Sequence, residues 1–331
     1  MNLLAHVTAD EPVGAAALLG LGDPDDLAAF RSLEDRVWDA TTLAAATLES
    51  IRVRCADLRG CAFCASVRMS GAVADGLTEA ELARQGDPDA DADATLPADR
   101  RAALVLVRAY LVEAAPPPDP VRADLLAALG PAGVVEVLVA CAAFASADLR
   151  IALGDNRPAR STLIPREHQQ RPRPAGAAGW PVPDGPVLSP TTTLPHLAPA
   201  LAAAVADRRA RLLTRDEVPG PLLAACAVRS AQLLGAPDRG PVADLLAPPD
   251  VRGDVDPTAV RDWTRTMSAD ERVVMAFAEQ LWVDPAGLDA TVVAPARVLL
   301  GDPGLVRLTW DLIWIAQLQR LAAVLGTEVP A

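Results

Sequence analysis

The stretch GCAFCASVR, residues 60–68, spaces Cys61 and Cys64 as a C-x-x-C pair in a chain with five cysteines. The thiolate is the nucleophilic form of cysteine, and a free thiol is mostly protonated at neutral pH. Gly60 directly before Cys61 predicts that a new helix begins there, where unpaired N–H groups favour an anion. Arg68, four residues after Cys64, should lie one turn from that sulfur on the same helix. The spacing therefore predicts a dithiol with a stabilised thiolate.

Other uses of the pair fit the sequence less well. A zinc site needs four ligands, and neither a second C-x-x-C nor a nearby His-x-x-x-His is present. Haem attachment needs histidine directly after the second cysteine, where Ala65 stands. We therefore expect no metal and no cofactor. Two small apolar side chains packed in a helix remain an alternative, because free cysteine is often buried and inert.

The elements that position this pair are predicted to be helices. Alanine, leucine and valine dominate the chain and aromatic residues make up 3% of it. An apolar helix face precedes the pair at Leu48, Ile51, Cys55 and Leu58. Helix start and end signals are a capping box at Thr78 and Glu81, an N-cap followed by proline at Asp119 and Pro120, and C-cap glycines at Gly60, Gly154 and Gly326. The expected fold class is all-α.

Composition excludes several kinds of partner. The formal net charge is −13 and all basic residues are arginines, which argues against nucleic acid and anionic membranes. The beginning of the chain has no basic region followed by an apolar one, so we expect no signal peptide. The longest apolar stretches, near the C-terminus, are interrupted by Arg307, Asp311 and Arg320, so we expect no bilayer-spanning segment. An odd number of cysteines disfavours a disulfide framework, and we expect a cytoplasmic protein.

The chain repeats itself on either side of a proline-rich segment. VRCADLRG at 53–60 recurs as VRSAQLLG at 228–235, and two further segments recur in the same order at nearly constant shift. They pair PADRRAALVLVRAYL with SADERVVMAFAEQLW, and GPAGVVEVLVACAAFASADLRIALG with DPGLVRLTWDLIWIAQLQRLAAVLG. This order predicts an internal duplication. We expect domains at 1–154 and 200–331, joined by a proline-rich linker at 155–199.

The segment LESIRVRCADLRGCAFCASVRMSGAVADGLTEAEL resembles the signature helix pair of the alkylhydroperoxidase D / carboxymuconolactone decarboxylase superfamily, whose redox members carry E-x11-C-x-x-C-x-x-x-H. Glu49, Cys61 and Cys64 match that pattern in type and spacing. The resemblance covers most of 44–154 and extends weakly to 221–326. It implies two homologous alkylhydroperoxidase D-like helical domains, the second lacking the cysteines.

The resemblance implies a role for each matching residue. Cys64 would attack a hydroperoxide and become a sulfenic acid, and Cys61 would resolve it as a disulfide. Glu49 would accept or relay the proton. The sequence departs from the family at two positions. Arg68 stands where the redox members have histidine, and Phe63 stands where some members have a second histidine, just before the second cysteine.

Arg68 replaces the proton-relay histidine, and arginine stays protonated in proteins. It would hold Cys64 as a thiolate or bind an anionic substrate; alternatively it points to solvent and pairs with a carboxylate such as Asp75. None of His6, His168 and His196 lies in the motif segment. A substitute role for the two linker histidines would require the linker to fold back, and we expect them to be solvent-exposed.

The second half lacks every residue of the predicted site. The repeat places Ala224, Ala236, Arg239 and Ala243 opposite Glu49, Cys61, Cys64 and Arg68. Cys226 falls opposite Ile51, a packing position. We expect a catalytically silent copy that supports assembly. Its Trp263, Trp282, Trp310 and Trp314 are expected to be core or interface aromatics, with a ligand pocket as the alternative.

The expected function is thiol-dependent reduction of hydroperoxides or disulfides, with a thiol or dithiol electron donor. Family members form trimers and hexamers of single domains, so the resemblance implies a homo-oligomer. One alternative is a redox-inactive binding or scaffold protein of the same fold. Another is a carboxymuconolactone decarboxylase-like, non-redox enzyme that acts on a carboxylated lactone, with Arg68 as an anion clamp. That branch does not need the cysteine pair.

Overall fold

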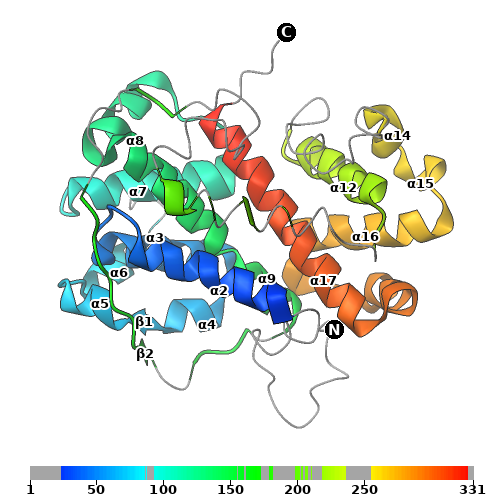
Figure 1. Ribbon diagram of the computed structural model, residues 1–331, viewed down its shortest axis with the longest axis horizontal. Coiled ribbons are helices and arrows are strands. Elements are labelled where there is room, and N and C mark those ends of the chain that lie inside the picture. Colours follow the sequence, from blue (N-terminus) through cyan, green and yellow to red (C-terminus); the bar gives the residue numbers. More distant parts are fainter. Residues whose placement is uncertain are drawn as a thin grey trace. The chain divides into compact units, whose positions relative to one another are not determined.

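The protein is mostly helical, which confirms the all-α prediction (Figure 1). The computed structural model describes residues 24–85, 87, 93–154, 156–159, 162–172, 179–181, 198–201, 203, 206–207, 210, 218–235 and 255–326. Within these residues the only sheet is a parallel pairing of β1 (Arg68–Met69) with β2 (Leu163–Ile164).

The chain forms two compact units that interleave along the sequence. The motif unit comprises 31–147, 156–206 and 320–331, and the second unit comprises 1–30, 148–155 and 207–319. The sequence predicts continuous domains instead. The difference arises because part of the proline-rich segment and the end of the last helix pack with the motif unit.

The motif unit is built around α3. It contains, in chain order, the greater part of α2 (Pro24–Asp39), then α3 (Ala45–Arg59), α4 (Ala62–Ser66), β1, α5 (Ser70–Ala74), α6 (Glu79–Gln85), α7 (Ala98–Arg108), the π-helix η2 (Ala109–Glu113), α8 (Asp119–Ala143) and β2. Helix α3 packs against α4, α5, α6, α7 and α8. It therefore lies at the centre of this unit.

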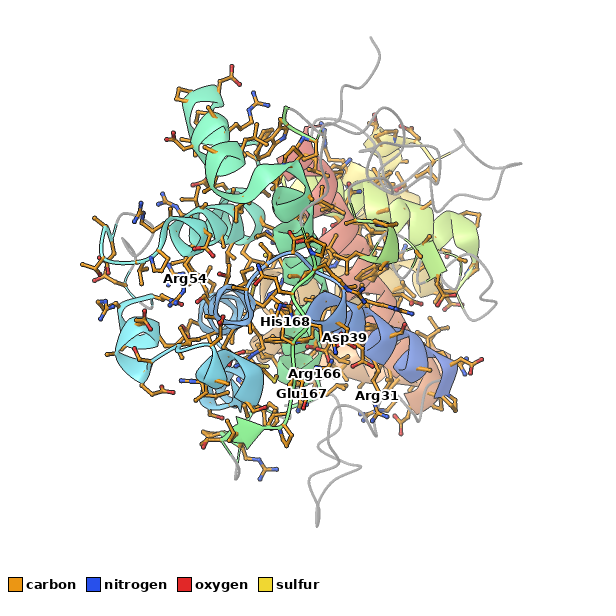
Figure 2. The ribbon with its side chains drawn as sticks, turned by 60° about the vertical axis from the view of Figure 1, so that its left-hand side comes forward. Arg31, Asp39, Arg54, Arg166, Glu167 and His168 are labelled. Atoms are coloured by element: carbon orange, nitrogen blue, oxygen red, sulfur yellow. The ribbon has the colours of Figure 1, made fainter. Side chains whose placement is uncertain are left out.

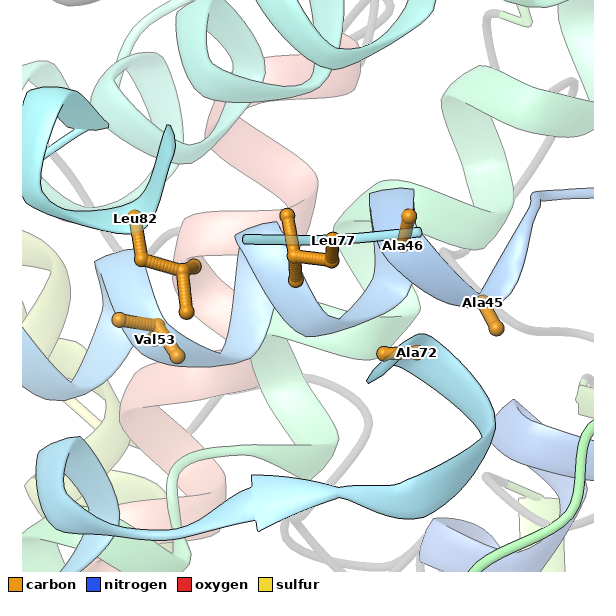
Figure 3. Packing of buried hydrophobic residues seen from close by; sticks show 6 residues of the cluster. All are labelled: Ala45, Ala46, Val53, Ala72, Leu77 and Leu82. Atoms are coloured by element: carbon orange, nitrogen blue, oxygen red, sulfur yellow. The ribbon is translucent and has the colours of Figure 1, made fainter. Parts of the chain in front are cut away.

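Helix α3 is buried on nearly all sides, and this explains which residues of the predicted apolar face are buried and which are not. Residues 45–56 are all buried, because neighbouring elements surround the helix along this length. Leu48, Ile51 and Cys55 are fully buried as predicted, whereas Leu58 is 38% exposed, since the last turn emerges from the core. Figure 3 shows one side of this packing, where residues of α3 meet residues of α5, α6 and their connection: Ala45, Ala46, Val53, Ala72, Leu77 and Leu82.

Most of the predicted helix signals are present. Gly60 ends α3 in the left-handed region at φ 73°, and Gly154 and Gly326 also have positive φ. The capping box at Thr78 is formed, because its hydroxyl accepts from the Glu81 N–H at 3.2 Å and its N–H donates to the Glu81 carboxylate at 2.9 Å. The predicted N-cap at Asp119 is wrong by one residue. Helix α8 has Pro118 as its N-cap, with no side-chain cap.

The second unit is also helical. It contains most of α9 (Ser146–Ala152), then α12 (Gly220–Leu233), α14 (Pro257–Arg261), α15 (Trp263–Thr266), α16 (Ala269–Val283), the 3-10 helix η3 (Pro285–Gly287) and α17 (Ala290–Leu325) up to residue 319. Helix α12 packs against α14 and α16. Helix α17 bends at Gly301 (φ 67°, ψ 172°), and α8 of the motif unit bends at Gly130 with nearly the same angles (φ 67°, ψ 168°).

The four tryptophans of the second unit divide into two kinds. Trp310 and Trp314 are 2% and 1% exposed, which confirms them as core residues. Trp263 and Trp282 are half-buried, and their indole N–H groups donate to the Glu279 carboxylate and the Leu312 carbonyl, each at 2.9 Å. Partial burial with a satisfied indole is usual for tryptophan.

One stretch among the described residues is long and apolar enough to cross a membrane by length and composition alone. It runs over 119–152. The prediction from the sequence rests on the C-terminal apolar stretches as the longest and does not single out this one. Within its most apolar window, 72% is buried inside the protein. That burial is what the core helix of a soluble protein shows.

Candidate active site at Cys61 and Cys64

The C-x-x-C pair begins a short helix, as predicted. Cys61 is the N-cap of α4, and its Sγ accepts a hydrogen bond from the Cys64 N–H at 3.3 Å. An N–H donor aimed at sulfur favours the thiolate of Cys61. Cys61 is 1% exposed, whereas Cys64 is partly exposed. Of the two sulfurs, Cys64 is the more accessible to a substrate.

Arg52 is the residue that ties this motif to the central helix. Its guanidinium donates to both carboxylate oxygens of Glu49, at 2.8 and 2.7 Å. It also donates to the backbone carbonyls of Cys64 and Val67, each at 2.6 Å. One buried side chain on α3 thereby fixes the backbone at the second cysteine and just after it.

Arg52 also supplies positive charge to the cysteine pair. Burial lowers the pKa of Arg52, but the charge and hydrogen bonds of Glu49 more than offset this and raise it, with a smaller favourable interaction from Cys64. The same attraction favours the thiolate of Cys64. Sequence reasoning missed Arg52. Its signal was the Glu49-x-x-Arg52 spacing, which places opposite charges side by side on a helix.

Glu49 is fully buried within this network. Beyond Arg52, its carboxylate accepts the Met69 N–H at 3.1 Å, so it holds the chain just after the motif as well. These contacts make Glu49 the charge partner of Arg52. Its role as a proton acceptor or relay stays a prediction.

Arg68 does not lie on the motif helix, contrary to the sequence prediction. Helix α4 ends at Ser66 and Arg68 begins β1, so the expected one-turn spacing from Cys64 does not form. Its guanidinium forms a bidentate ion pair with the Glu79 carboxylate, with N–O distances of 2.8 and 2.9 Å. It also donates to the carbonyls of Ala65 and Val67, at 2.6 and 2.7 Å. The carboxylate that pairs with Arg68 is thus Glu79.

These contacts predict that Arg68 matters little for thiol reactivity. The Glu79 side chain is 72% exposed, and exposed ion pairs contribute only about 0–1 kcal/mol. We expect Arg68→Ala to leave the alkylation rate of Cys64 by a small neutral reagent within about twofold of wild type at neutral pH. Glu79→Gln removes the same ion pair by changing the carboxylate partner, and it is the matched control. Tenfold slower alkylation in Arg68→Ala alone would show that the guanidinium activates the thiol.

The beginning of the proline-rich segment folds back along the motif helix. We call residues 156–159 and 162–172 the strap. Asn156 accepts the Ala62 N–H at 2.6 Å and donates to the Gly60 carbonyl at 2.9 Å, which caps the start of α4 a second time. The Ala159 N–H donates to the Ser66 hydroxyl at 2.8 Å, at the other end of α4. The strap therefore holds both ends of the helix that carries Cys64.

The rest of the strap is fixed to β1, α5 and the connection between α2 and α3 (Figure 2). The Gly71 N–H donates to the Arg166 carbonyl at 2.8 Å, and a Cβ on Gly71 would lie 2.7 Å from that oxygen. The two ring nitrogens of His168 bond to the carbonyls of Trp38 and Leu43. His168 is half-buried and structural, so the expectation of an exposed linker histidine is wrong.

The predicted counterparts in the second half can be followed only in part. Ala224 is fully buried in α12, whereas residues 236, 239 and 243 lie outside the described residues, as do His6 and His196. Cys226 is fully buried, and burial raises its pKa to about 12. Such a thiol is inert at neutral pH, which fits the packing role predicted for it.

A metal site is disfavoured by the sequence, because the four ligands that zinc needs are not present at suitable spacing. Within the described part of the chain, no three histidine, cysteine or acidic side chains gather where they could hold a metal ion.

Known proteins do not identify this chain. No protein-family model, no curated protein and no solved structure matches it. The function is therefore argued from the residues and contacts of the site.

Proposed function

We propose that the motif unit reduces hydroperoxides or disulfides through the dithiol of Cys61 and Cys64. The observation that supports this most directly is the hydrogen bond from the Cys64 N–H to the Cys61 sulfur at a helix start. It favours the thiolate of the buried Cys61, and the positive charge of Arg52 favours the thiolate of the more exposed Cys64.

The difference in exposure assigns the two steps. The Cys64 thiolate attacks the outer oxygen of a hydroperoxide, the O–O bond breaks, and the departing alkoxide takes a proton from the medium to become an alcohol. Cys64 is then a sulfenic acid. The Cys61 thiolate attacks that sulfur and displaces hydroxide, which is protonated to water. For a disulfide substrate, Cys64 attacks sulfur instead, and the first leaving group is a thiolate.

Electrons return from a thiol or dithiol donor, which reduces the Cys61–Cys64 disulfide by exchange at the accessible Cys64 sulfur. The chemistry needs no further cofactor, because the two thiols supply both electrons. Arg52 assists by its charge and by holding the Cys64 and Val67 carbonyls. Glu49 keeps Arg52 in place, and a proton-relay role for Glu49 remains part of the proposal.

We also propose that the second half of the chain, 200–331, arose by duplication of the alkylhydroperoxidase D-like first half. Features recur at matching places in the repeated segments. Positive-φ glycines close the equivalent helices, and α8 and α17 bend at equivalent glycines with nearly equal angles; the pairs are Gly60 and Gly235, Gly130 and Gly301, and Gly154 and Gly326. The family likeness further leads us to propose a cytoplasmic homo-oligomer.

Two competing functions predict different behaviour. A redox-inactive binding or scaffold protein of the same fold would keep its thiols under oxidant. A carboxymuconolactone decarboxylase-like enzyme would need a free cationic group for a carboxylated lactone. The Arg68 guanidinium is instead engaged by Glu79 and two carbonyls, which disfavours it as an anion clamp.

Counting thiols tests the proposal. We expect one equivalent of hydroperoxide per chain to remove two thiols from the wild type within the first, fast phase. The Cys61→Ser/Cys64→Ser double variant should lose none in that phase. Thiols are titrated under denaturing conditions after quenching, and Cys226→Ser is the control for general oxidation. Full retention of thiols in the native wild type would favour the redox-inactive alternative.

A further inference from the structure

Cys61 lies between two peptide groups whose polar atoms are all hydrogen-bonded. Its own N–H and carbonyl bond to backbone atoms of α3 and α4, at 2.8 and 2.9 Å. The remaining two groups, the Gly60 carbonyl and the Ala62 N–H, both bond to the side-chain amide of Asn156, at 2.9 and 2.6 Å. One side chain of the strap therefore adds one hydrogen bond to the peptide group on each side of Cys61.

The two cysteines of the motif are anchored by different elements. The Cys64 carbonyl accepts from the Arg52 guanidinium of α3 at 2.6 Å. Asn156 belongs to the strap, and its two bonds flank Cys61 at the start of α4. A change at Asn156 therefore acts first on Cys61 and leaves the Arg52 anchor of Cys64 in place.

We propose that Asn156 is a positioning residue for Cys61, which holds the Cys61 sulfur ready to attack Cys64 after Cys64 has reacted. The step assigned to Cys61 rests on the proposed function. As the N-cap of α4, Cys61 already directs its Sγ at the Cys64 N–H, at 3.3 Å. A disulfide needs the two Cβ atoms about 3.5–4.5 Å apart, so closure is sensitive to small displacements of either backbone. Holding reacting groups in the right geometry is what makes such an intramolecular step fast.

The amide of asparagine suits this position because it offers both a donor and an acceptor. Alanine at position 156 would remove both hydrogen bonds. Aspartate would keep an acceptor for the Ala62 N–H, but it cannot donate to the Gly60 carbonyl and adds a negative charge beside Cys61. A nearby negative charge disfavours a thiolate. The two substitutions therefore separate the helix cap from the donor and the charge.

A chromogenic aromatic disulfide, added at one equivalent per chain, follows the two cysteines separately. The Cys64 thiolate attacks one reagent sulfur, the reagent S–S bond breaks, and one coloured aryl thiolate leaves. The Cys61 thiolate then attacks the Cys64 sulfur of the mixed disulfide and releases the second aryl thiolate. The two cysteine protons go to the medium. The two cysteines have lost two electrons, and the reagent has gained them.

The first release reports on Cys64 and the second on Cys61. Asn156→Ala should slow the second release about tenfold, because the Cys61 backbone is no longer held, and should leave the first within about twofold of wild type. Asn156→Asp should also slow the second release and move its pH profile to higher pH, because the added charge disfavours the Cys61 thiolate. This variant keeps the helix cap, so it carries the test if Asn156→Ala does not fold. A role in helix stability alone would not move that pH profile.

Ser66→Ala is the matched control, because the Ser66 hydroxyl accepts the Ala159 N–H at 2.8 Å and ties the strap to the other end of α4. It should leave both releases within about twofold of wild type. Thermal unfolding followed by circular dichroism shows which variants are folded at the assay temperature, and the Cys61→Ser/Cys64→Ser variant gives the background.

Three results would overturn the proposal: an unchanged second release in Asn156→Ala, equal slowing in Ser66→Ala, or a wild type that releases a single aryl thiolate per chain. The reagent reacts with any accessible dithiol, whether or not the protein reduces hydroperoxides. Failure of the proposed function appears instead as thiols that survive hydroperoxide, so the two can fail separately.

Discussion

Cys64→Ser should abolish the fast consumption of hydroperoxide, whereas Cys61→Ser should retain a single fast turnover. In the proposed mechanism the more accessible sulfur, Cys64, performs the attack, and the buried Cys61 acts only after a sulfenic acid has formed. Without a thiol donor, Cys61→Ser should yield about one equivalent of alcohol per chain, and Cys64 should then react with a sulfenic-acid trapping reagent. Product alcohol is measured by rapid quench, and the trapped cysteine by peptide mass spectrometry.

Two controls define this experiment. Cys226→Ser should turn over within about twofold of wild type, because its thiol is buried and its pKa is raised to about 12. The Cys61→Ser/Cys64→Ser variant sets the slow background from other thiols. Sulfenic acid at Cys61 in Cys64→Ser, formed at the wild-type rate, would reverse the order of the two cysteines.

Arg52→Met is expected to lower the free energy of unfolding by about 3–5 kcal/mol, because it removes one partner of a buried ion pair and leaves the other partner charged in the core. The Glu49 carboxylate, which is 0% exposed, would lose both of its Arg52 hydrogen bonds. The carbonyls of Cys64 and Val67 would also lose their donors. Denaturant unfolding followed by circular dichroism gives the change, and alkylation of Cys64 should slow with the loss of positive charge.

A double variant separates the ion pair from the other contacts. Glu49→Leu/Arg52→Met should recover part of the lost stability, since it no longer buries an unpaired charge. Arg84→Met, which breaks the more exposed pair with Asp93, should cost no more than about 1 kcal/mol. A similar small cost for Arg52→Met would contradict the role given to it.

Local signals in the sequence were sufficient for much of the fold. Glycine at position 60 and the polar start of α6 act over a few residues, so they can be identified without tertiary structure. The helix start at Cys61 belongs to the same class, because a helix N-terminus is set by its own first turn. The predicted position of Arg68 failed because α4 ends after five residues, and no local signal fixed that length.

The rest of the candidate site depends on contacts over long sequence separations. Burial of Arg52 follows from the neighbours that surround α3, and a helix that is buried all round has no polar face to reveal which charges lie inside. The strap is proline-rich and lacks helical periodicity, which is also typical of a free linker. Its binding to α4 rests on single side chains such as Asn156, which composition does not distinguish.

The second cap on α4 comes from Asn156, which is synthesised long after α4 itself, so the site is completed late during synthesis. Ala62 and Asn156 are separated by 94 positions. At a translation rate of about 5–20 residues per second, Asn156 emerges roughly 5–20 s after the helix that it caps. Until then the Ala62 N–H and the Gly60 carbonyl must bind water instead. The nascent thiols are therefore exposed to the surrounding solvent for several seconds before the structure that shields one and positions the other is complete.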